Sequence, residues 1–413
     1  MVRRLYPRGV IERILEALSD TPVVAVNGAR QVGKSTLMGQ LRDAGVNAEI
    51  LSLDDSAQRR LAVADPDGFV ERRAPTLVID EVQLVPELMR AVKASVDRDR
   101  RPGRFVLTGS TRLLATPGIT ESLAGRMEVI ELWPLSQGEL ASRPERFVDA
   151  CFGGIDAVAA SSDLTKDDYI ERLCAGGFPE AERRRGSRRG AWFEAYATSV
   201  VERVVNEVAD VRRQGEIPQL VRLCAARTGQ ELNVAAMGSE LGLPARTTSA
   251  YLAHLATVFL VSLHPAWATN LSAKVVRKPK VVMVDSGLAA HLLRADPASL
   301  RQPDAPLGPL METFVLGELR RQMSWAPSWP SLSHFRDRQG YEVDAVLEGP
   351  GARVVGLEVK ASTAVSSRDF RGLRLLAERL GPRFVAGIVL YTGRQTVPAS
   401  DRLAAMPISA LWS

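Results

Sequence analysis

Apolar positions in the first third of the chain fall into short runs that predict strands of a parallel sheet. The runs are VVAV at 23–26, AEILSL at 48–53, LVI at 77–79, RFVL at 104–107 and EVIEL at 128–132. They are mostly continuous rather than alternating, which is typical of strands covered by helices on both faces. The pattern therefore predicts an α/β domain with a parallel sheet over residues 1–140.

The remaining patterns predict three further regions. Residues 141–225 read as an inserted loop at 141–165 followed by helices, which we expect to form a helical lid on the first domain. Residues 226–284 predict two helices joined by a Gly-Leu-Pro turn and followed by two strands, the order of a winged helix. Residues 285–413 predict a helix, three strands, a helix and a strand, an order that resembles the core of restriction-endonuclease-like folds.

A glycine-rich loop separates the first predicted strand from the helix that follows it. It reads GARQVGKS and fits G-x-x-x-x-G-K-[ST] at every fixed position. We expect its two glycines to adopt backbone angles forbidden to other residues, so that loop N–H groups converge on phosphates at the helix N-terminus. Lys34 then reaches the β- and γ-phosphates, and Ser35 holds Mg²⁺. We expect ATP, with Mg²⁺, to contact Gly28, Ala29, Arg30, Gln31, Val32, Gly33, Lys34, Ser35 and Thr36.

The predicted catalytic groups stand close to the strand ends. Asp80 and Glu81 follow the run LVI, and ligands of open parallel sheets bind at the carboxyl ends of the strands. Asp80 suits a water-mediated contact with Mg²⁺, and Glu81 suits activation of the attacking water. Ser110 or Thr108 suits the γ-phosphate, with capping of the strand end as the alternative. Arg126, in a loop expected beside this edge, suits stabilisation of transferred charge in cis or from another subunit, with a structural ion pair as the alternative.

Several motifs together resemble a prokaryotic family of AAA-type ATPases whose C-terminal half is classed as a domain of unknown function. They are GARQVGKS, LVIDEVQ, VLTGS, SLAGR followed by ELWPLS, GGFPE, DSGLAAHLL and METFVLGEL. The resemblance covers nearly the whole chain. It implies ATP binding and oligomer-dependent hydrolysis, hence a homo-oligomer, but it supplies no cellular role.

Acidic residues of the last region suggest a metal-dependent nuclease. Asp344 lies within one predicted strand, and Glu358 and Lys360 share one face of the next. Asp344 and Glu358 could therefore share one Mg²⁺, with Lys360 positioning water or offsetting charge on phosphate. Further carboxylates are available to complete the site: Glu312 or Glu318, and Glu342. Val343 stands where a proline often precedes the aspartate, so cleavage, binding without cleavage and a structural role all stay open.

The charge of the chain favours a polyanionic partner, DNA in the first place. The net charge is +5 and the pI is about 9.3. The candidate contacts form two basic groups, Arg183, Arg184, Arg185, Arg188 and Arg189, and Lys274, Arg277, Lys278 and Lys280. The alternatives are a solvated loop for the first group and a protein-docking winged helix for the second.

Cysteine content and hydropathy suggest a cytoplasmic protein without a membrane partner. The three cysteines have no metal-binding spacing and cannot form an even disulfide framework. No apolar run approaches the ~20 residues of a membrane span. Two functions therefore compete: a Mg²⁺-dependent ATPase coupled to DNA, with possible cleavage, and a non-enzymatic ATP-driven switch that docks a protein.

Overall fold

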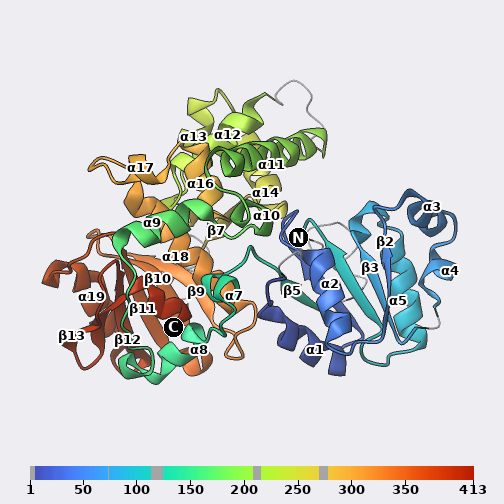
Figure 1. The fold of residues 1–413 in the computed structure, drawn as a ribbon, viewed down its shortest axis with the longest axis horizontal. Coiled ribbons are helices and arrows are strands. Elements are labelled where there is room, and N and C mark those ends of the chain that lie inside the picture. Colours follow the sequence, from blue (N-terminus) through green and yellow to red (C-terminus); the bar gives the residue numbers. More distant parts are fainter. Residues whose placement is uncertain (1–4, 73, 113–122, 124, 208–214, 269–277) are drawn as a thin grey trace. The chain divides into compact units, whose positions relative to one another are not determined.

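The apolar runs of the first third form one five-stranded parallel sheet in the computed structural model, in the order β2-β3-β4-β1-β5. The strands are β1 (Val23–Asn27), β2 (Ala48–Ser52), β3 (Thr76–Asp80), β4 (Phe105–Gly109) and β5 (Met127–Glu131). The helices are α1 (Val10–Asp20), α2 (Lys34–Asp43), α3 (Ser56–Ala64), α4 (Pro66–Val70) and α5 (Leu88–Arg98) (Figure 1). The structure describes residues 5–72, 74–112, 123, 125–207, 215–268 and 278–413.

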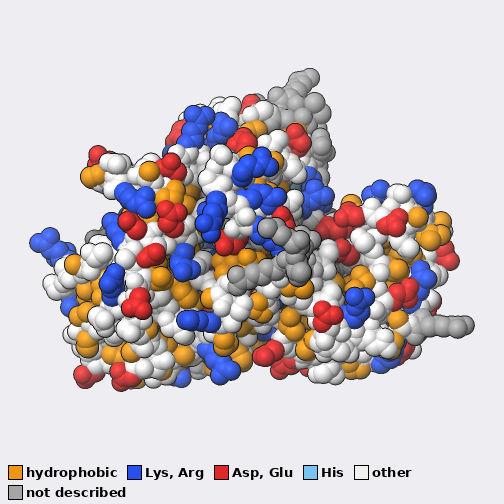
Figure 2. All heavy atoms as spheres, in the orientation of Figure 1, with side chains coloured by type: hydrophobic (Ala, Val, Ile, Leu, Met, Phe, Trp, Pro, Cys, Tyr) orange, Lys and Arg blue, Asp and Glu red, His pale blue; other side chains and the backbone are white. Residues whose placement is uncertain are grey.

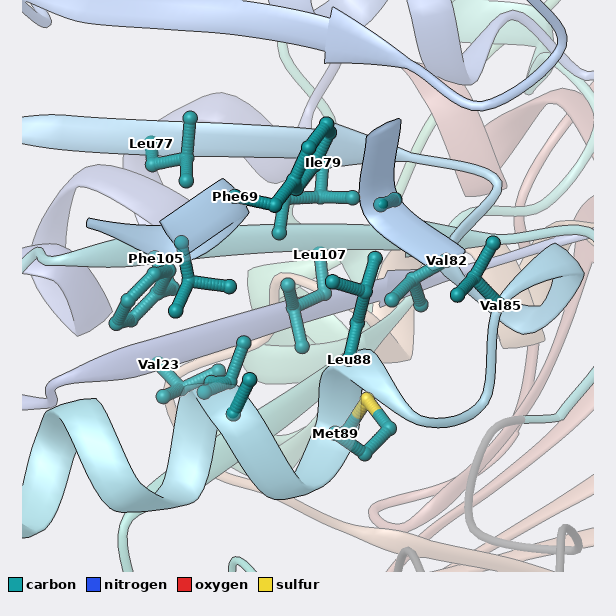
Figure 3. Close-up of a cluster of buried hydrophobic side chains, with 14 of the residues drawn as sticks. Val23, Phe69, Leu77, Ile79, Val82, Val85, Leu88, Met89, Phe105 and Leu107 are labelled. Atoms are coloured by element: carbon teal, nitrogen blue, oxygen red, sulfur yellow. The ribbon is translucent and has the colours of Figure 1, made fainter. Parts of the chain in front are cut away.

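Both faces of this sheet are buried, which is why its strands read as continuous apolar runs. On one face, α5 places Leu88 and Met89 against Leu107 of β4 in a closed hydrophobic cluster (Figure 3). Alternate residues of the same strands, such as Val24 and Val106, are equally buried on the opposite face. Because each such side chain contributes roughly 1.5–3 kcal/mol on burial, the sheet is a rigid base for the loops at its edge.

The chain divides into two compact units, Met1–Pro134 with Thr257–Phe259, and Leu135–Ala256 with Leu260–Ser413. The second unit therefore contains most of all three regions predicted after residue 140. Its first part holds α7 (Gln137–Ala141), α8 (Phe147–Ala150), α9 (Lys166–Ala175), α10 (Pro179–Glu182), α11 (Gly186–Glu207), α16 (Ser286–Leu292) and α17 (Pro297–Leu300). The segment 141–165, expected as an inserted loop, includes the short helix α8 and buries Phe147, Val148 and Cys151.

Residues 216–283 contain three helices and the three strands of a small antiparallel sheet, in the chain order α12, β6, α13, α14, β7, β8. The helices are α12 (Glu216–Ala226), α13 (Val234–Glu240) and α14 (Ala245–Thr257). The strands are β6 (Gln230–Glu231), β7 (Val261–His264) and β8 (Lys280–Met283), in the order β6-β8-β7. The predicted contacts Lys274 and Arg277 lie outside the described residues.

The C-terminal part is a six-stranded mixed sheet in the order β13-β14-β12-β11-β10-β9. Its elements are α18 (Leu307–Met323), β9 (Ser331–Arg336), β10 (Glu342–Glu348), β11 (Val354–Lys360), α19 (Arg371–Leu380), β12 (Phe384–Tyr391), β13 (Val397–Ser400) and β14 (Leu403–Pro407). The predicted order of helix, three strands, helix and strand is present, and the two last strands were not predicted. Helix α19 packs its apolar face on β12, whereas α18 lies against β11.

Candidate functional site

The glycine loop joins β1 to α2, and its two glycines are needed for different reasons. Gly33 has φ +101° directly before the helix, a conformation that favours glycine. Gly28 has no positive φ, but a Cβ there would lie 2.3 Å from the carbonyl oxygen of Leu132. The expectation that Gly28 needs an unusual backbone angle was therefore wrong. The left-handed angle falls on Gln31 instead, at φ 61°.

Lys34 is the first residue of α2 and is nearly completely buried. Its Nζ donates to the carbonyl oxygens of Gly28 and Ala29, at 3.0 and 3.1 Å, and lies 3.5 Å from Glu81 Oε1. Burial lowers the pKa of Lys34 below its usual range, against the opposing effect of Glu81 and Asp80. The ammonium group is thus held inside the loop, at the place where the loop encloses an anion.

Ser35 and Asp80 meet across the loop as the motif requires. Ser35 Oγ donates to Asp80 Oδ2 at 2.9 Å, and the hydroxyl of Thr108 on β4 donates to Asp80 Oδ1. A hydroxyl and a carboxylate side by side are hard oxygen ligands of the kind that Mg²⁺ prefers, so these residues fit the ion that accompanies a nucleotide.

Glu81 follows β3 in a left-handed conformation, φ 58° and ψ 44°, which is uncommon for a residue with a side chain. Its N–H donates to Thr108 Oγ1 at 3.1 Å, and Gln83 Nε2 donates both to its carboxylate and to Ser110 Oγ. Burial raises the pKa of Glu81, but the charge of Lys34 and bonds from Ser110 and Gln83 outweigh burial and lower it. The carboxylate is therefore ionised near neutral pH and held in one orientation.

Arg126 lies at the opposite end of the sheet from Lys34, Asp80 and Glu81. It directly precedes β5, at the amino end of a parallel sheet whose glycine loop follows the carboxyl end of β1. Its Nη2 lies 2.8 Å from Asp97 Oδ1 of α5. The placement beside the ligand edge was wrong, and within one chain Arg126 forms the structural ion pair that was the alternative.

The C-terminal carboxylates face one cavity of about 680 Å³. Ala345 of β10 stands opposite Leu357 of β11, a register that brings Asp344 next to Glu358. Asp344 Oδ2 accepts from the N–H of Val359 at 2.9 Å, and Lys360 Nζ lies 2.7 Å from Glu358 Oε1. The predicted strand residues are thus brought together.

Lys280 is the unexpected member of this group. We predicted a nucleic-acid contact, but its side chain is only 2% exposed and its Nζ lies 2.8 Å from Glu312, 2.8 Å from Glu342 and 3.3 Å from Asp344. Glu312 therefore faces the cavity from α18. A lysine at the start of an apolar strand gives no sequence signal of such a partner set, because the carboxylates come from distant segments. We call Glu312, Glu342, Asp344 and Glu358 the carboxylate site.

As they stand, these carboxylates do not fit a metal ion. Within the described residues, no group of three or more His, Cys, Asp or Glu is arranged to hold one. Burial, followed by the nearby Asp344 charge, raises the pKa of Glu312 and of Glu358 to about 8. The shared Mg²⁺ expected at Asp344 and Glu358 is therefore not supported by the geometry.

The first basic group is partly engaged in local ion pairs. Arg183 and Arg184 each lie 2.8 Å from Glu180, and Arg189 lies 4.0 Å from Glu182. The two remaining members are exposed: Arg185 directly precedes α11, and Arg188 lies in its first turn. On the face drawn in Figure 2, Lys and Arg side chains are interspersed with Asp and Glu rather than gathered in one basic patch.

A second buried polar cluster, which we call the junction network, joins the motifs WPLS, GGFPE, DSGL and METFVLGEL. Asp285 accepts from the N–H groups of Gly177 and Leu288, at 2.7 and 2.9 Å. Glu318 lies 2.9 Å from Arg321 and accepts from the N–H of Gln137. The motifs therefore have a structural role, and Glu318 belongs here rather than to the carboxylate site.

Glu145 adds a further buried carboxylate to the junction network. It accepts from the N–H of Gly138 at 2.9 Å and from the hydroxyl of Ser136. Burial, followed by the charge of Glu318, raises the pKa of Glu145 to about 8, and burial raises that of Glu318 to about 7. The junction network is therefore most stable when the carboxyl groups of Glu145 and Glu318 are protonated.

We expect stability to fall as pH rises from about 5 to 8, and Glu145→Gln to reduce this fall by roughly 1–3 kcal/mol. The unfolded chain releases the Glu145 proton near its ordinary pKa, whereas the folded chain keeps it to about 8. The unfolded state therefore binds fewer protons in this window, and the free energy of unfolding decreases with pH. Urea unfolding at several pH values measures this. Glu12→Gln, on an exposed part of α1, is the control; an equal slope in both variants would contradict the assignment.

Comparisons with known families divide the chain into three parts. Residues 20–141 match an AAA domain, residues 166–299 a domain of unknown function (DUF8612) and residues 307–411 another domain of unknown function (DUF4143). The first match covers the sheet that carries the glycine loop. Residues 20–141 are therefore an AAA-type P-loop ATPase domain, which supports ATP hydrolysis and implies nucleotide binding with the usual Mg²⁺ requirement.

Two uncharacterized proteins, from Mycobacterium bovis and Mycobacterium tuberculosis, are each 28% identical over 406 residues, which is 97% of this chain and 83% of the relative. A Walker-type ATPase of Pyrococcus abyssi matches 71% of this chain and all of its own at 14% identity and TM-score 0.42. RuvB of Thermotoga maritima matches 62% of this chain and 89% of its own at 16% identity and TM-score 0.26. At these TM-scores the structural likenesses carry no further conclusion. Among the helices that the structure describes, none combines the length and the hydropathy of a membrane-spanning segment.

Proposed function

We propose that this protein is a Mg²⁺-dependent ATPase that couples its nucleotide state to engagement of nucleic acid, DNA in the first place. One observation carries the ATPase part. Lys34 and Ser35 of the glycine loop meet Glu81 and Asp80 at the end of β3, within 3.5 and 2.9 Å. A phosphate-binding ammonium, a Mg²⁺ ligand pair and an oriented base thus converge on one sheet edge.

The proposed reaction is attack of water on the γ-phosphorus with cleavage of its bond to the bridging oxygen. Glu81, held by Gln83, orients the water and accepts its proton. Lys34 offsets negative charge on the β- and γ-phosphate oxygens, and the loop N–H groups hold the phosphates in place. Bound through Ser35 and, by way of water, Asp80, Mg²⁺ would neutralise further phosphate charge. Ser110 contacts the same glutamine and helps to fix the water-activating group.

The elements from α12 to β8 support a winged-helix interpretation. Helices α13 and α14 lie in the chain between β6 and β7 of the antiparallel sheet β6-β8-β7. In a winged helix of this order, α14 would be the recognition helix. Arg246 and Ser249 of α14 are exposed, whereas Thr248 is buried. With little charge on this helix, exposed arginines outside it supply the proposed electrostatic contact. A protein-docking winged helix is the rival.

We expect the double variant Arg185→Ala/Arg188→Ala to weaken DNA binding and to reduce the slope of log K against log salt by about 2. Both side chains are exposed, and each phosphate contact releases roughly one counterion. Fluorescence anisotropy with labelled DNA between low and physiological salt measures the slope. Arg100→Ala/Arg101→Ala, an exposed pair after α5, is the matched control. Salt-insensitive binding, unchanged by the first pair, would favour the rival.

For the C-terminal domain we propose contact with nucleic acid without cleavage. The element order and the pairing of Asp344 with Glu358 and Lys360 support a restriction-endonuclease-like fold and, with it, the expectation of a nuclease. The ammonium of Lys280 lies among the same carboxylates, which disfavours a metal ion there. Incubation of the wild-type protein with Mg²⁺ and single-stranded, duplex or branched DNA tests this. Cleavage that is lost in Asp344→Ala would overturn the proposal.

The experiment that tests the proposed function as a whole is an ATPase assay with and without these DNA forms. We expect Mg²⁺-dependent hydrolysis that DNA alters. If no DNA form changes the hydrolysis rate, the coupling to nucleic acid is rejected, whereas the ATPase activity itself is retained. A homo-oligomer, in which Arg126 acts on a neighbouring subunit, also remains a proposal; sedimentation with and without ATP tests it.

A further inference from the structure

The centre of the carboxylate site is occupied by an ammonium group. Lys280 Nζ has one oxygen of Glu312 at 2.8 Å, one of Glu342 at 2.8 Å and one of Asp344 at 3.3 Å. Three acceptors around one nitrogen match the three N–H donors of an ammonium group. These nitrogen–oxygen distances are those of charged hydrogen bonds. Mg²⁺ and Ca²⁺ would lie closer to their oxygen ligands, at roughly 2.0–2.6 Å.

The position of Lys280 is fixed by the small sheet. Strand β8 is the central strand, and Lys280 pairs through its backbone with Glu231 of β6 and His264 of β7. Its side chain is 2% exposed, so the head group does not extend to water as surface lysines do. His264 Nε2 lies 3.2 Å from the carbonyl oxygen of Asp344, so it contacts the backbone of the same site. The Asp344 carboxylate accepts from Lys280 and from the N–H of Val359.

The carboxylates around Lys280 are buried or half-buried, so an ammonium group among them stabilises their ionised forms. Four carboxylates face the cavity, and a second lysine of its lining, Lys360, lies 2.7 Å from Glu358. Glu358 Oε2 is buried without a hydrogen-bond partner among the described residues. Removal of this ammonium leaves the buried ionised carboxylates without their nearest opposing charge, so they must take up either protons or another cation.

We propose that Lys280 is a built-in cation that takes the place of a divalent metal ion in the carboxylate site, and that the site binds such an ion only when this ammonium is removed. The inference deepens the proposed non-cleaving role of the C-terminal domain and rests on it. It is independent of ATP hydrolysis.

The test counts Mn²⁺ ions bound by the full-length, nucleotide-free protein, from the electron paramagnetic resonance signal of free Mn²⁺. Lys280→Met removes the ammonium and keeps an unbranched side chain. We expect this variant to bind one more Mn²⁺ per chain than the wild type, and the gain to disappear in Lys280→Met/Asp344→Asn. Lys278→Met is the matched control, because Lys278 is exposed at the same cavity two residues earlier. It should bind as the wild type does.

The wild type gives a second, independent comparison. We expect wild type and Asp344→Asn to bind equal numbers of Mn²⁺ ions; any ion at the glycine loop contributes equally to both. An extra Asp344-dependent ion in the wild type would overturn the inference, as would a folded Lys280→Met that gains none. Should Lys280→Met fail to fold, the wild-type comparison alone decides. Mg²⁺-dependent cleavage by the wild type would instead reject the non-cleaving role, a readout separate from the Mn²⁺ counts.

Discussion

Lys34→Ala is expected to weaken ATP binding by about 100-fold, which corresponds to ~2.7 kcal/mol. The Lys34 ammonium is buried inside the glycine loop and lies 3.0 Å from the Gly28 carbonyl oxygen. It is thus already enclosed where phosphates bind, and charged hydrogen bonds in such a place contribute most. Isothermal titration with ATP and Mg²⁺ measures the effect. Hydrolysis should fall with binding.

The control is Lys93→Ala, a lysine of α5 in the same domain. It should bind ATP as the wild type does. Because Lys34 also lies 3.5 Å from Glu81, its removal perturbs a second charge. Thermal unfolding therefore accompanies the titration, so that loss of binding is not mistaken for loss of folding. Unchanged ATP affinity in a folded Lys34→Ala would remove the basis of the proposed function.

Glu81→Gln is expected to leave ATP affinity within about 3-fold of wild type and to lower the hydrolysis rate by ~10³-fold. Glutamine keeps the size of the side chain but cannot accept the proton of the attacking water. The carboxylate of the wild type is held ionised by Lys34, Ser110 and Gln83, which is the state a general base requires. Single-turnover hydrolysis of ATP separates this chemical step from binding.

Glu87→Gln serves as its matched control, because Glu87 is an exposed glutamate just before α5. Its hydrolysis rate should equal that of the wild type. If Glu81→Gln hydrolyses ATP at the wild-type rate, another group activates the water.

The sequence by itself predicted the residues of the proposed nucleotide site, because that chemistry depends on neighbours in the chain. The spacing of Gly28, Gly33, Lys34 and Ser35 fixes a loop of known form, and the apolar run before Asp80 places it at a strand end. Continuous apolar runs likewise predicted the five parallel strands, since a strand buried on both faces has few polar positions. The alternation of Glu358 and Lys360 on one strand face followed from the same local geometry.

The tertiary structure alone decided the partners of buried charges. Lys280 and Asp344 are 64 positions apart, and Gly177 and Asp285 are 108 apart, so no local pattern reports that they meet. Arg126 has the sequence context of a catalytic arginine, yet its place at the amino end of β5 pairs it with Asp97. Coulombic attraction depends on distance and burial, and both are set by how segments pack. Composition shows that a lysine is present; only the fold shows whether it meets DNA, water or a carboxylate.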